Sequence, residues 1–210
     1  MTNEYWDKRY LEEGKIWGER PSETAVHAAK LFRRHRAKKL LVPGSGYGRN
    51  TKFFSEAGFN VTGVEISEEA VKIAREFDPG THVYNISALD MSMLKDRYDA
   101  IYSFNVLHLF REAERKEFIR QCAEKLHNNG LMFFTVFSEN EASYGKGAEV
   151  EKNTYESKPG RPVHYFSESD LKDHFQSMEI IETGIMEDRE NHGDEGPHTH
   201  ILRYICVKTR

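Results

Sequence analysis

A regular alternation of apolar runs and amphipathic segments, starting near residue 39, limits what this chain can fold into. Runs rich in branched and aromatic residues, ended by Gly, Pro or Asn, predict strands at 39–42, 60–64, 82–86, 98–104 and 131–137. Apolar residues three and four apart predict helices at 51–57, 67–77 and 111–126. Strands that alternate with helices favour an α/β domain with a largely parallel sheet.

The second half of the chain departs from this alternation. Residues 138–166 are polar, carry several Gly and Pro residues and show no period, so we expect an irregular segment on the substrate side. A short helix begins near Ser167, and 178–186 and 201–207 predict two closing strands. With residues 1–36 as an N-terminal helical cover, we expect one domain spanning 1–210.

Composition argues against several classes of partner. The 210 residues carry a net charge of −4, which disfavours nonspecific electrostatic binding to nucleic acid or to an anionic membrane. The basic run 33–39 fits a helix C-terminus, with a phosphate or nucleic-acid patch as the alternative. Two distant cysteines and no long apolar run or leader-like N-terminus predict a cytoplasmic protein. The oligomeric state cannot be read from the sequence.

A glycine-rich turn, Gly44-Ser45-Gly46-Tyr47-Gly48, follows the first predicted strand. At this place in a parallel sheet, glycines allow close approach of a ligand to bare backbone N–H groups. Glu65 lies 21 residues after Gly44, at the end of the second strand, where a carboxylate can accept from both ribose hydroxyls. Arg49 stands where a dinucleotide fold would have its third glycine, which disfavours NAD.

Four segments together resemble the class I methyltransferases that depend on S-adenosylmethionine (SAM). They are Leu41–Gly48, Val64–Ser67, Tyr98–His108 and Leu126–Phe134. The resemblance implies a Rossmann-like, seven-stranded, mostly parallel sheet with helices on both faces and an antiparallel C-terminal hairpin. It also implies that SAM is the cofactor and that the protein is an enzyme that transfers the methyl group of SAM to an acceptor.

The resemblance places the cofactor on residues that match the motifs of the family. The glycine loop would contact the methionine part of SAM, Glu65 would bind the ribose, and Asn105 would lie beside the methionine or the transferred methyl. Two alignments compete for the adenine: one places Ser87 and Ala88 there, and the other uses the carboxylate of Asp90. The full set of expected cofactor residues is Gly44, Ser45, Gly46, Arg49, Glu65, Ile66, Ser87, Ala88, Asp90, Asn105 and Trp17.

Val42-Pro43-Gly44 resembles the thiol, halide and thiopurine methyltransferases, whereas most of the family has an acidic residue at position 42. Segments 5–10, 17–18 and 48–50 resemble the tellurite-resistance methyltransferases. By this analogy the acceptor is a small soft nucleophile such as a thiol, tellurite or selenite, or a halide. The alternatives are methylation of another small metabolite, or a SAM-binding protein without turnover.

A sulfonium methyl is already activated, so positioning does most of the work and we assign no catalytic residue. Three aromatic residues near the N-terminus could cover the sulfonium through cation–π attraction, or could simply pack an N-terminal helix: Trp6, Tyr10 and Trp17. Trp17 is the best candidate for the covering role. His108 could accept a proton or could be a hydrogen-bonded structural histidine, which we favour.

The acidic, histidine-rich stretch 192–200 allows two interpretations. His198 and His200 would share one face of an extended segment, and imidazoles with carboxylates suit zinc. Solvated loops often collect such residues, so we favour a substrate-facing loop and expect no metal. His164 and Tyr165 could line the substrate pocket or could belong to ordinary packing.

Overall fold

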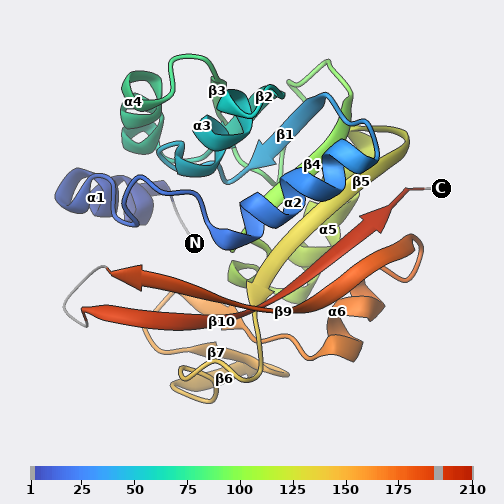
Figure 1. The fold of residues 1–210 in the computed structure, drawn as a ribbon. Helices are drawn as coiled ribbons and strands as arrows, with labels where there is room; N and C mark the ends of the chain where they lie inside the picture. Colours follow the sequence, from blue (N-terminus) through green and yellow to red (C-terminus); the bar gives the residue numbers. More distant parts are fainter. Residues whose placement is uncertain (1–2, 192–195, 210) are drawn as a thin grey trace.

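The computed structural model describes residues 3–191 and 196–209, and a twisted seven-stranded sheet crosses its centre (Figure 1). Its strand order is β3-β2-β1-β4-β5-β10-β9. The strands are β1 (Lys39–Pro43), β2 (Asn60–Glu65), β3 (His82–Asn85), β4 (Tyr98–Phe104), β5 (Leu126–Phe137), β9 (Glu179–Asn191) and β10 (Pro197–Lys208). Strands β1 to β5 pair in parallel, and β10 is antiparallel to both neighbours. The predicted sheet and its C-terminal hairpin are confirmed.

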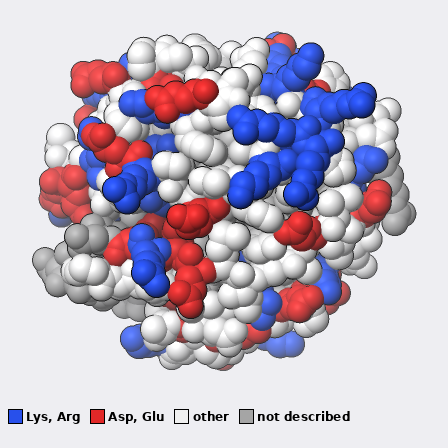
Figure 2. Space-filling model, viewed as in Figure 1, with Lys and Arg blue, Asp and Glu red and all other residues white. Residues whose placement is uncertain are grey.

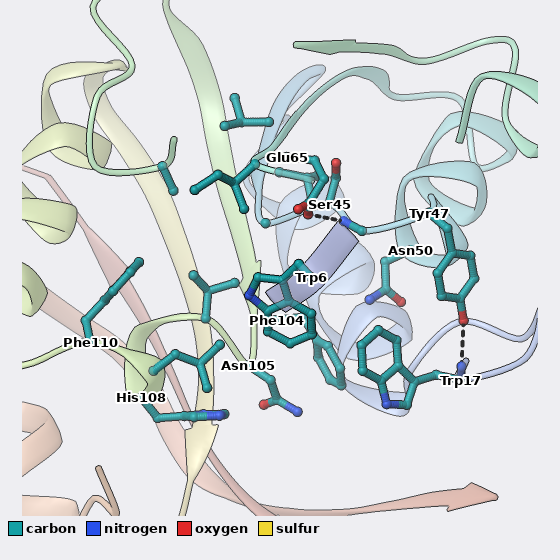
Figure 3. A pocket seen from close by; sticks show the side chains of 18 of the residues that line it. Trp6, Trp17, Ser45, Tyr47, Asn50, Glu65, Phe104, Asn105, His108 and Phe110 are labelled. Carbon is teal, nitrogen blue, oxygen red and sulfur yellow. Dashed lines mark hydrogen bonds between the residues drawn. The ribbon is translucent and has the colours of Figure 1, made fainter. Parts of the chain in front are cut away.

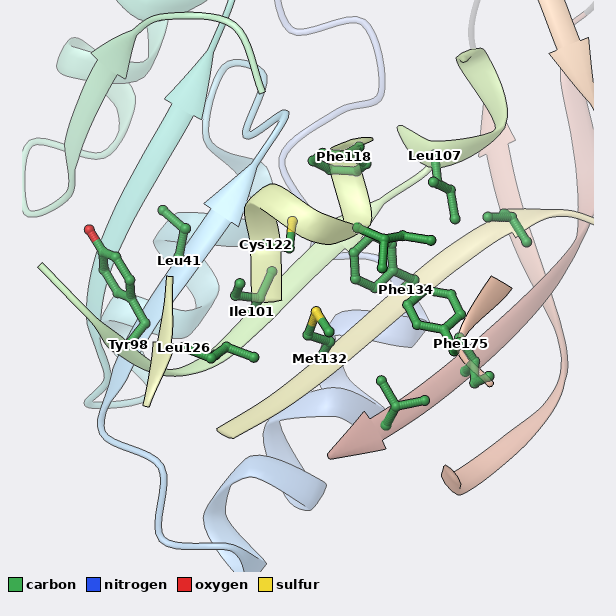
Figure 4. Packing of buried hydrophobic residues seen from close by; sticks show 14 of the residues in the cluster. Leu41, Tyr98, Ile101, Leu107, Phe118, Cys122, Leu126, Met132, Phe134 and Phe175 are labelled. Carbon is green, nitrogen blue, oxygen red and sulfur yellow. The ribbon is translucent and has the colours of Figure 1, made fainter. Parts of the chain in front are cut away.

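Helices cover both faces of this sheet because its strands are apolar on both sides. The helices are α1 (Asn3–Glu13), α2 (Glu23–Arg34), α3 (Arg49–Glu56), α4 (Glu68–Phe77), α5 (Glu112–Glu124) and α6 (Glu168–His174). Successive residues of β5 point to opposite faces: Phe133 belongs to the core under α2 and α3, whereas Phe134 packs with residues of α5 and α6 (Figure 4). The strand therefore anchors two helical layers at once.

Two stretches are more ordered than the sequence indicated. The segment expected to be irregular, 138–166, contains a small antiparallel sheet of β6 (Ala148–Glu151), β7 (Thr154–Glu156) and β8 (Pro162–His164). Strands of three or four residues are too short to show a period. The closing strands also run farther than expected, so 187–191 and 197–200 are strand rather than loop.

The basic run at residues 33–39 lies at the C-terminal end of α2, where the sequence placed a helix end. Arg33 and Arg34 occupy the last turn, and the Arg33 guanidinium donates to the Ala57 carbonyl at 2.8 Å. Basic side chains gather over this part of the face shown in Figure 2. Among the described residues, no helix has both the length and the apolar character that a membrane span requires.

A short 3-10 helix, η1 (Leu107–Leu109), is held against the end of β5 by His108. The backbone N–H of Phe137 donates to His108 Nδ1 at 3.2 Å, and the two rings stack with centroids 4.2 Å apart. His108 is 2% exposed, and this burial lowers its pKa to about 3. Because Nδ1 accepts a hydrogen bond, the ring is neutral with its proton on Nε2. The structural interpretation of His108 is supported.

We expect His108 to make the fold acid-sensitive. A histidine with a lowered pKa in the folded state binds its proton mainly after unfolding, so its contribution is complete above about pH 6.5 and declines as the pH falls toward 3. Between pH 7.5 and pH 5 the wild type should lose roughly 2 kcal/mol of unfolding free energy through this group. Urea unfolding of His108→Gln should show a correspondingly smaller loss.

The matched control for this measurement is His35→Gln, because His35 is an exposed histidine at the C-cap of α2. Its loss of stability between the two pH values should equal that of the wild type. Equal losses in His108→Gln and in the wild type would show that His108 does not carry the effect.

Candidate active site

The glycine loop connects β1 to α3 and requires backbone angles that other residues rarely adopt. Gly44 and Gly46 have φ of 70° and 58°. A Cβ on Gly44 would lie 2.3 Å from Val106 Cγ2, and one on Gly46 would lie 2.9 Å from the Tyr10 hydroxyl. The loop is thus closely packed between the end of β4 and helix α1, and it presents its backbone rather than side chains to the space beside it.

Glu65, the last residue of β2, is bound by the loop that it faces. Its Oε2 accepts from the Gly46 N–H at 2.8 Å and its Oε1 from the Ser67 N–H at 2.9 Å. Burial raises the pKa of this carboxyl, while the N–H donors of Ser67 and Gly46 act in the opposite direction. Each oxygen has a second lone pair, so the carboxylate can still accept from a ligand hydroxyl.

The two alternatives kept for the adenine end occupy different surroundings. Ser87 and Ala88, after β3, line the cavity beside Glu65 and Ile66. Asp90 is exposed, is not among the cavity-lining residues, and its carboxylate accepts from the Ser92 N–H at 3.2 Å. The structure brings the first pair to the site and leaves Asp90 outside it.

Asn105 follows β4 in a left-handed conformation, with φ of 55°. Thr135 on the neighbouring strand β5 fixes it: the Asn105 N–H donates to the Thr135 hydroxyl, which in turn donates to the Asn105 amide oxygen, both at 3.1 Å. This pair sets the amide at the cavity wall between the glycine loop and η1 (Figure 3).

Aromatic residues of α1 and the following loop cover the glycine loop. Trp17 stacks on Tyr47 with an interplanar angle of 11° and a centroid distance of 6.1 Å, and the backbone N–H of Trp17 donates to the Tyr47 hydroxyl (Figure 3). Trp6 and Tyr10 complete the cluster. The three predicted residues therefore pack together and also line the cavity, so both expected roles are open to them.

Arg49 joins this cover to the C-terminal hairpin. Its guanidinium donates to the Trp17 carbonyl at 3.1 Å and to Glu190 Oε1 at 2.9 Å, and it lies over the Phe104 ring at 5.0 Å. Arg49 lines the cavity, as predicted for a cofactor residue, but the guanidinium N–H groups named above donate to protein acceptors. Its direct part in cofactor binding stays a prediction.

One cavity of about 330 Å³ connects these groups. At one end lie Ser45 of the glycine loop and Glu65, and at the other lie His108 and Phe110 (Figure 3). The cavity is also lined by residues that the sequence analysis did not assign to it, among them Leu109, Glu114, Phe137, Arg161, Val163 and Glu190. The arrangement can hold a nucleoside-containing cofactor beside a second, smaller molecule.

His164 and Tyr165 are not among the cavity-lining residues. His164 bonds Thr154 at 2.8 Å and Asp170 at 2.6 Å, which fastens the small sheet to α6, and the Tyr165 hydroxyl donates to Ser143 at 2.9 Å. His200 reaches the cavity instead. The spacing of Asp188 and Glu190, and of His198 and His200, could have predicted that each pair shares one face of a strand. Alternation of polar residues alone, however, does not distinguish a strand from a loop.

Comparison with known proteins agrees with this arrangement. Residues 41–134 match the family of methyltransferase domains. The ubiquinone biosynthesis O-methyltransferase of Idiomarina loihiensis is 29% identical over 124 residues, which cover 56% of this chain and 48% of that protein. The chain thus spans about half the length of this curated relative.

Solved structures extend the likeness to nearly the whole chain. A protein from a study of the conversion of a disulfide bond into a thioacetal group in echinomycin biosynthesis superposes with a TM-score of 0.80 at 18% identity, covering 99% of this chain and 93% of that one. TehB from Haemophilus influenzae has a TM-score of 0.66 at 18% identity, covering 99% and 67%.

A third solved structure contains a product of the cofactor. The 1,6-didemethyltoxoflavin-N1-methyltransferase of Burkholderia thailandensis, with bound S-adenosylhomocysteine (SAH), has a TM-score of 0.68 at 18% identity and covers 98% and 83%. The predicted resemblance is confirmed by the domain match and by these neighbours. Residues 41–134 match the methyltransferase-domain family, and the chain has the fold of solved SAM-dependent methyltransferases.

Proposed function

We propose that this protein transfers the methyl group of SAM to a small soft nucleophile, such as a thiol, a tellurium or selenium oxyanion, or a halide. The observation that carries the proposal is a continuous cavity that runs from the glycine loop and Glu65, past Asn105, to an end lined by Phe110, Phe137 and other apolar residues. Such a cavity holds the donor and the acceptor in line while it excludes water.

The cofactor end supports SAM. The backbone N–H groups of a glycine loop, a carboxylate at the end of β2 and the small pair Ser87 and Ala88 are the features that bind the methionine part, the ribose and the adenine in the resemblance stated above. In this chain, these features lie on a fold that is shared with proteins whose solved structures contain SAM or SAH. This supports the proposed cofactor residues, with Asp90 as the weakest of them.

The acceptor end supports a nucleophile that arrives already deprotonated. His108 faces this end, but its pKa of about 3 and its Nε2 proton make it a hydrogen-bond donor rather than a base. Thiolates and oxyanions need little general-base help. Donation from the His108 Nε2–H, together with the Arg161 side chain that also lines the cavity, would favour an anionic acceptor.

A second candidate is methyl transfer to a hydroxyl of another small metabolite. The O-methyltransferase relative favours it, although that protein is matched over only part of its length. A cofactor-binding protein without turnover is the least supported alternative, because the cavity continues beyond Asn105.

We expect Glu65→Gln to weaken cofactor binding. The amide keeps the size of the side chain but loses the charge that strengthens hydrogen bonds from ribose hydroxyls, a loss of about 1.5–3 kcal/mol. Isothermal titration with SAH should then show a Kd raised roughly 10- to 100-fold. Glu68→Gln, at the exposed start of α4, is the matched control and should bind as the wild type does. Unchanged affinity in Glu65→Gln would contradict the assigned role.

Acceptor preference can be measured with methyl-labelled SAM and a panel of small thiols, tellurite, selenite, halides and catechol-type hydroxyl compounds. We expect product only with the soft nucleophiles, and a rate with thiols that rises with pH as the thiol ionises. Gly44→Ala should abolish transfer, because the added Cβ would lie 2.3 Å from Val106 Cγ2. Transfer to hydroxyl compounds alone would favour the second candidate.

A further inference from the structure

Four ionisable side chains share one face of the C-terminal hairpin. In the register of β9 and β10, His198 lies opposite Glu190 and His200 lies opposite Asp188. Alternate residues of a strand point to the same side, so both cross-strand pairs face the same way. One ligating atom each from Glu190, His198 and His200 lie within 4.8 Å of one another. The hairpin thus brings together a carboxylate and two imidazoles.

Hydrogen bonds behind the two rings fix their orientation. The Gly196 carbonyl lies 2.8 Å from His198 Nδ1, and Glu141 Oε1 lies 2.7 Å from His200 Nδ1. Both acceptors require a proton on Nδ1, so in the neutral rings the Nε2 atoms present lone pairs. Metal-ligating histidines typically donate their second N–H to a carboxylate or a backbone carbonyl in this way.

The spacing of the ligating atoms suits a bound ion. The two Nε2 atoms lie 3.2 Å apart, and Glu190 Oε2 lies 3.6 Å from His200 Nε2. Two lone pairs at such a distance repel each other unless a cation or a shared proton lies between them. With Zn–N bonds of about 2.0–2.1 Å, ligand atoms in a tetrahedral site are about 3.3 Å apart.

The charges around the cluster favour a cation. Asp188, Glu190 and Glu141 are buried acids, and the Arg49 guanidinium lies 2.9 Å from Glu190 and 3.7 Å from Asp188. Asp188 is 4% exposed, and its Oδ2 has no hydrogen-bond partner among the residues that the structure describes. In the part of the chain that the structure describes, these three carboxylates outnumber the one guanidinium that pairs with two of them, and this favours a divalent cation.

We propose that Glu190, His198 and His200 bind a divalent transition-metal ion, with Zn²⁺ as the best match to two imidazoles and a carboxylate. The sequence favoured a substrate-facing loop at 192–200; residues 197–200 are part of β10, and 192–195 lie outside the described residues. Glu190 and His200 also line the cavity, so the ion would lie beside the acceptor end. If the proposed function holds, it would coordinate the acceptor sulfur or oxygen and favour its anionic form.

Zinc binding can be measured on the full chain without any methyl transfer. After treatment with a chelator, the protein would be titrated with Zn²⁺ by calorimetry and its metal content determined by mass spectrometry. We expect one equivalent at micromolar affinity or tighter. His198→Ala should weaken binding at least about 100-fold, and Glu141→Gln about 10- to 100-fold, because Glu141 orients a ligand.

Thr199→Ala is the matched control, because Thr199 lies between the two histidines but is exposed on the opposite face of β10. It should bind Zn²⁺ as the wild type does. Anomalous diffraction from zinc-soaked wild-type crystals needs no variant and should place the ion between the three side chains. Absence of binding, an ion elsewhere, or folded His198→Ala with wild-type affinity would overturn the proposal. SAH titration of the same samples tests the proposed function separately.

Discussion

The buried guanidinium of Arg49 ties together the parts of this molecule that surround the cavity. It begins α3 directly after the glycine loop, donates to the Trp17 carbonyl in the N-terminal cover and pairs with Glu190 on the C-terminal hairpin. A buried cation is destabilising unless it is paired and hydrogen-bonded. Moving these three segments apart would leave the buried guanidinium without its partners, which costs free energy. The cover, the loop and the hairpin are thereby held at one edge of the sheet.

Around this charge the cavity divides into two chemical environments. The cofactor end presents backbone N–H groups and the Glu65 carboxylate, which can recognise a polar nucleoside. The acceptor end is bordered by aromatic rings and by a histidine whose low pKa keeps it neutral. Methyl transfer from a sulfonium needs alignment and exclusion of water more than it needs proton transfer, and this division would suit the proposed reaction.

Much of the cofactor end could be predicted from the sequence, because its signals are local. Glycines at fixed spacing after a strand and an acid at the end of the next strand follow from the geometry of one βαβ unit. The competition between Ser87-Ala88 and Asp90 could not be resolved this way, since a shift of two residues after β3 moves a side chain from the cavity wall to the surface. The acceptor end was mostly missed because its residues come from η1, β5, β8 and the hairpin.

The sequence alone determined the alternating α/β architecture, the glycine loop and Glu65, because these depend on periodicity and short-range spacing. Only the tertiary structure decided that Arg49 pairs with Glu190, that His108 is buried and neutral, and that Glu190 meets His198 and His200. Such contacts join residues up to 141 positions apart. They depend on strand register and on the burial of charge, which no local pattern specifies.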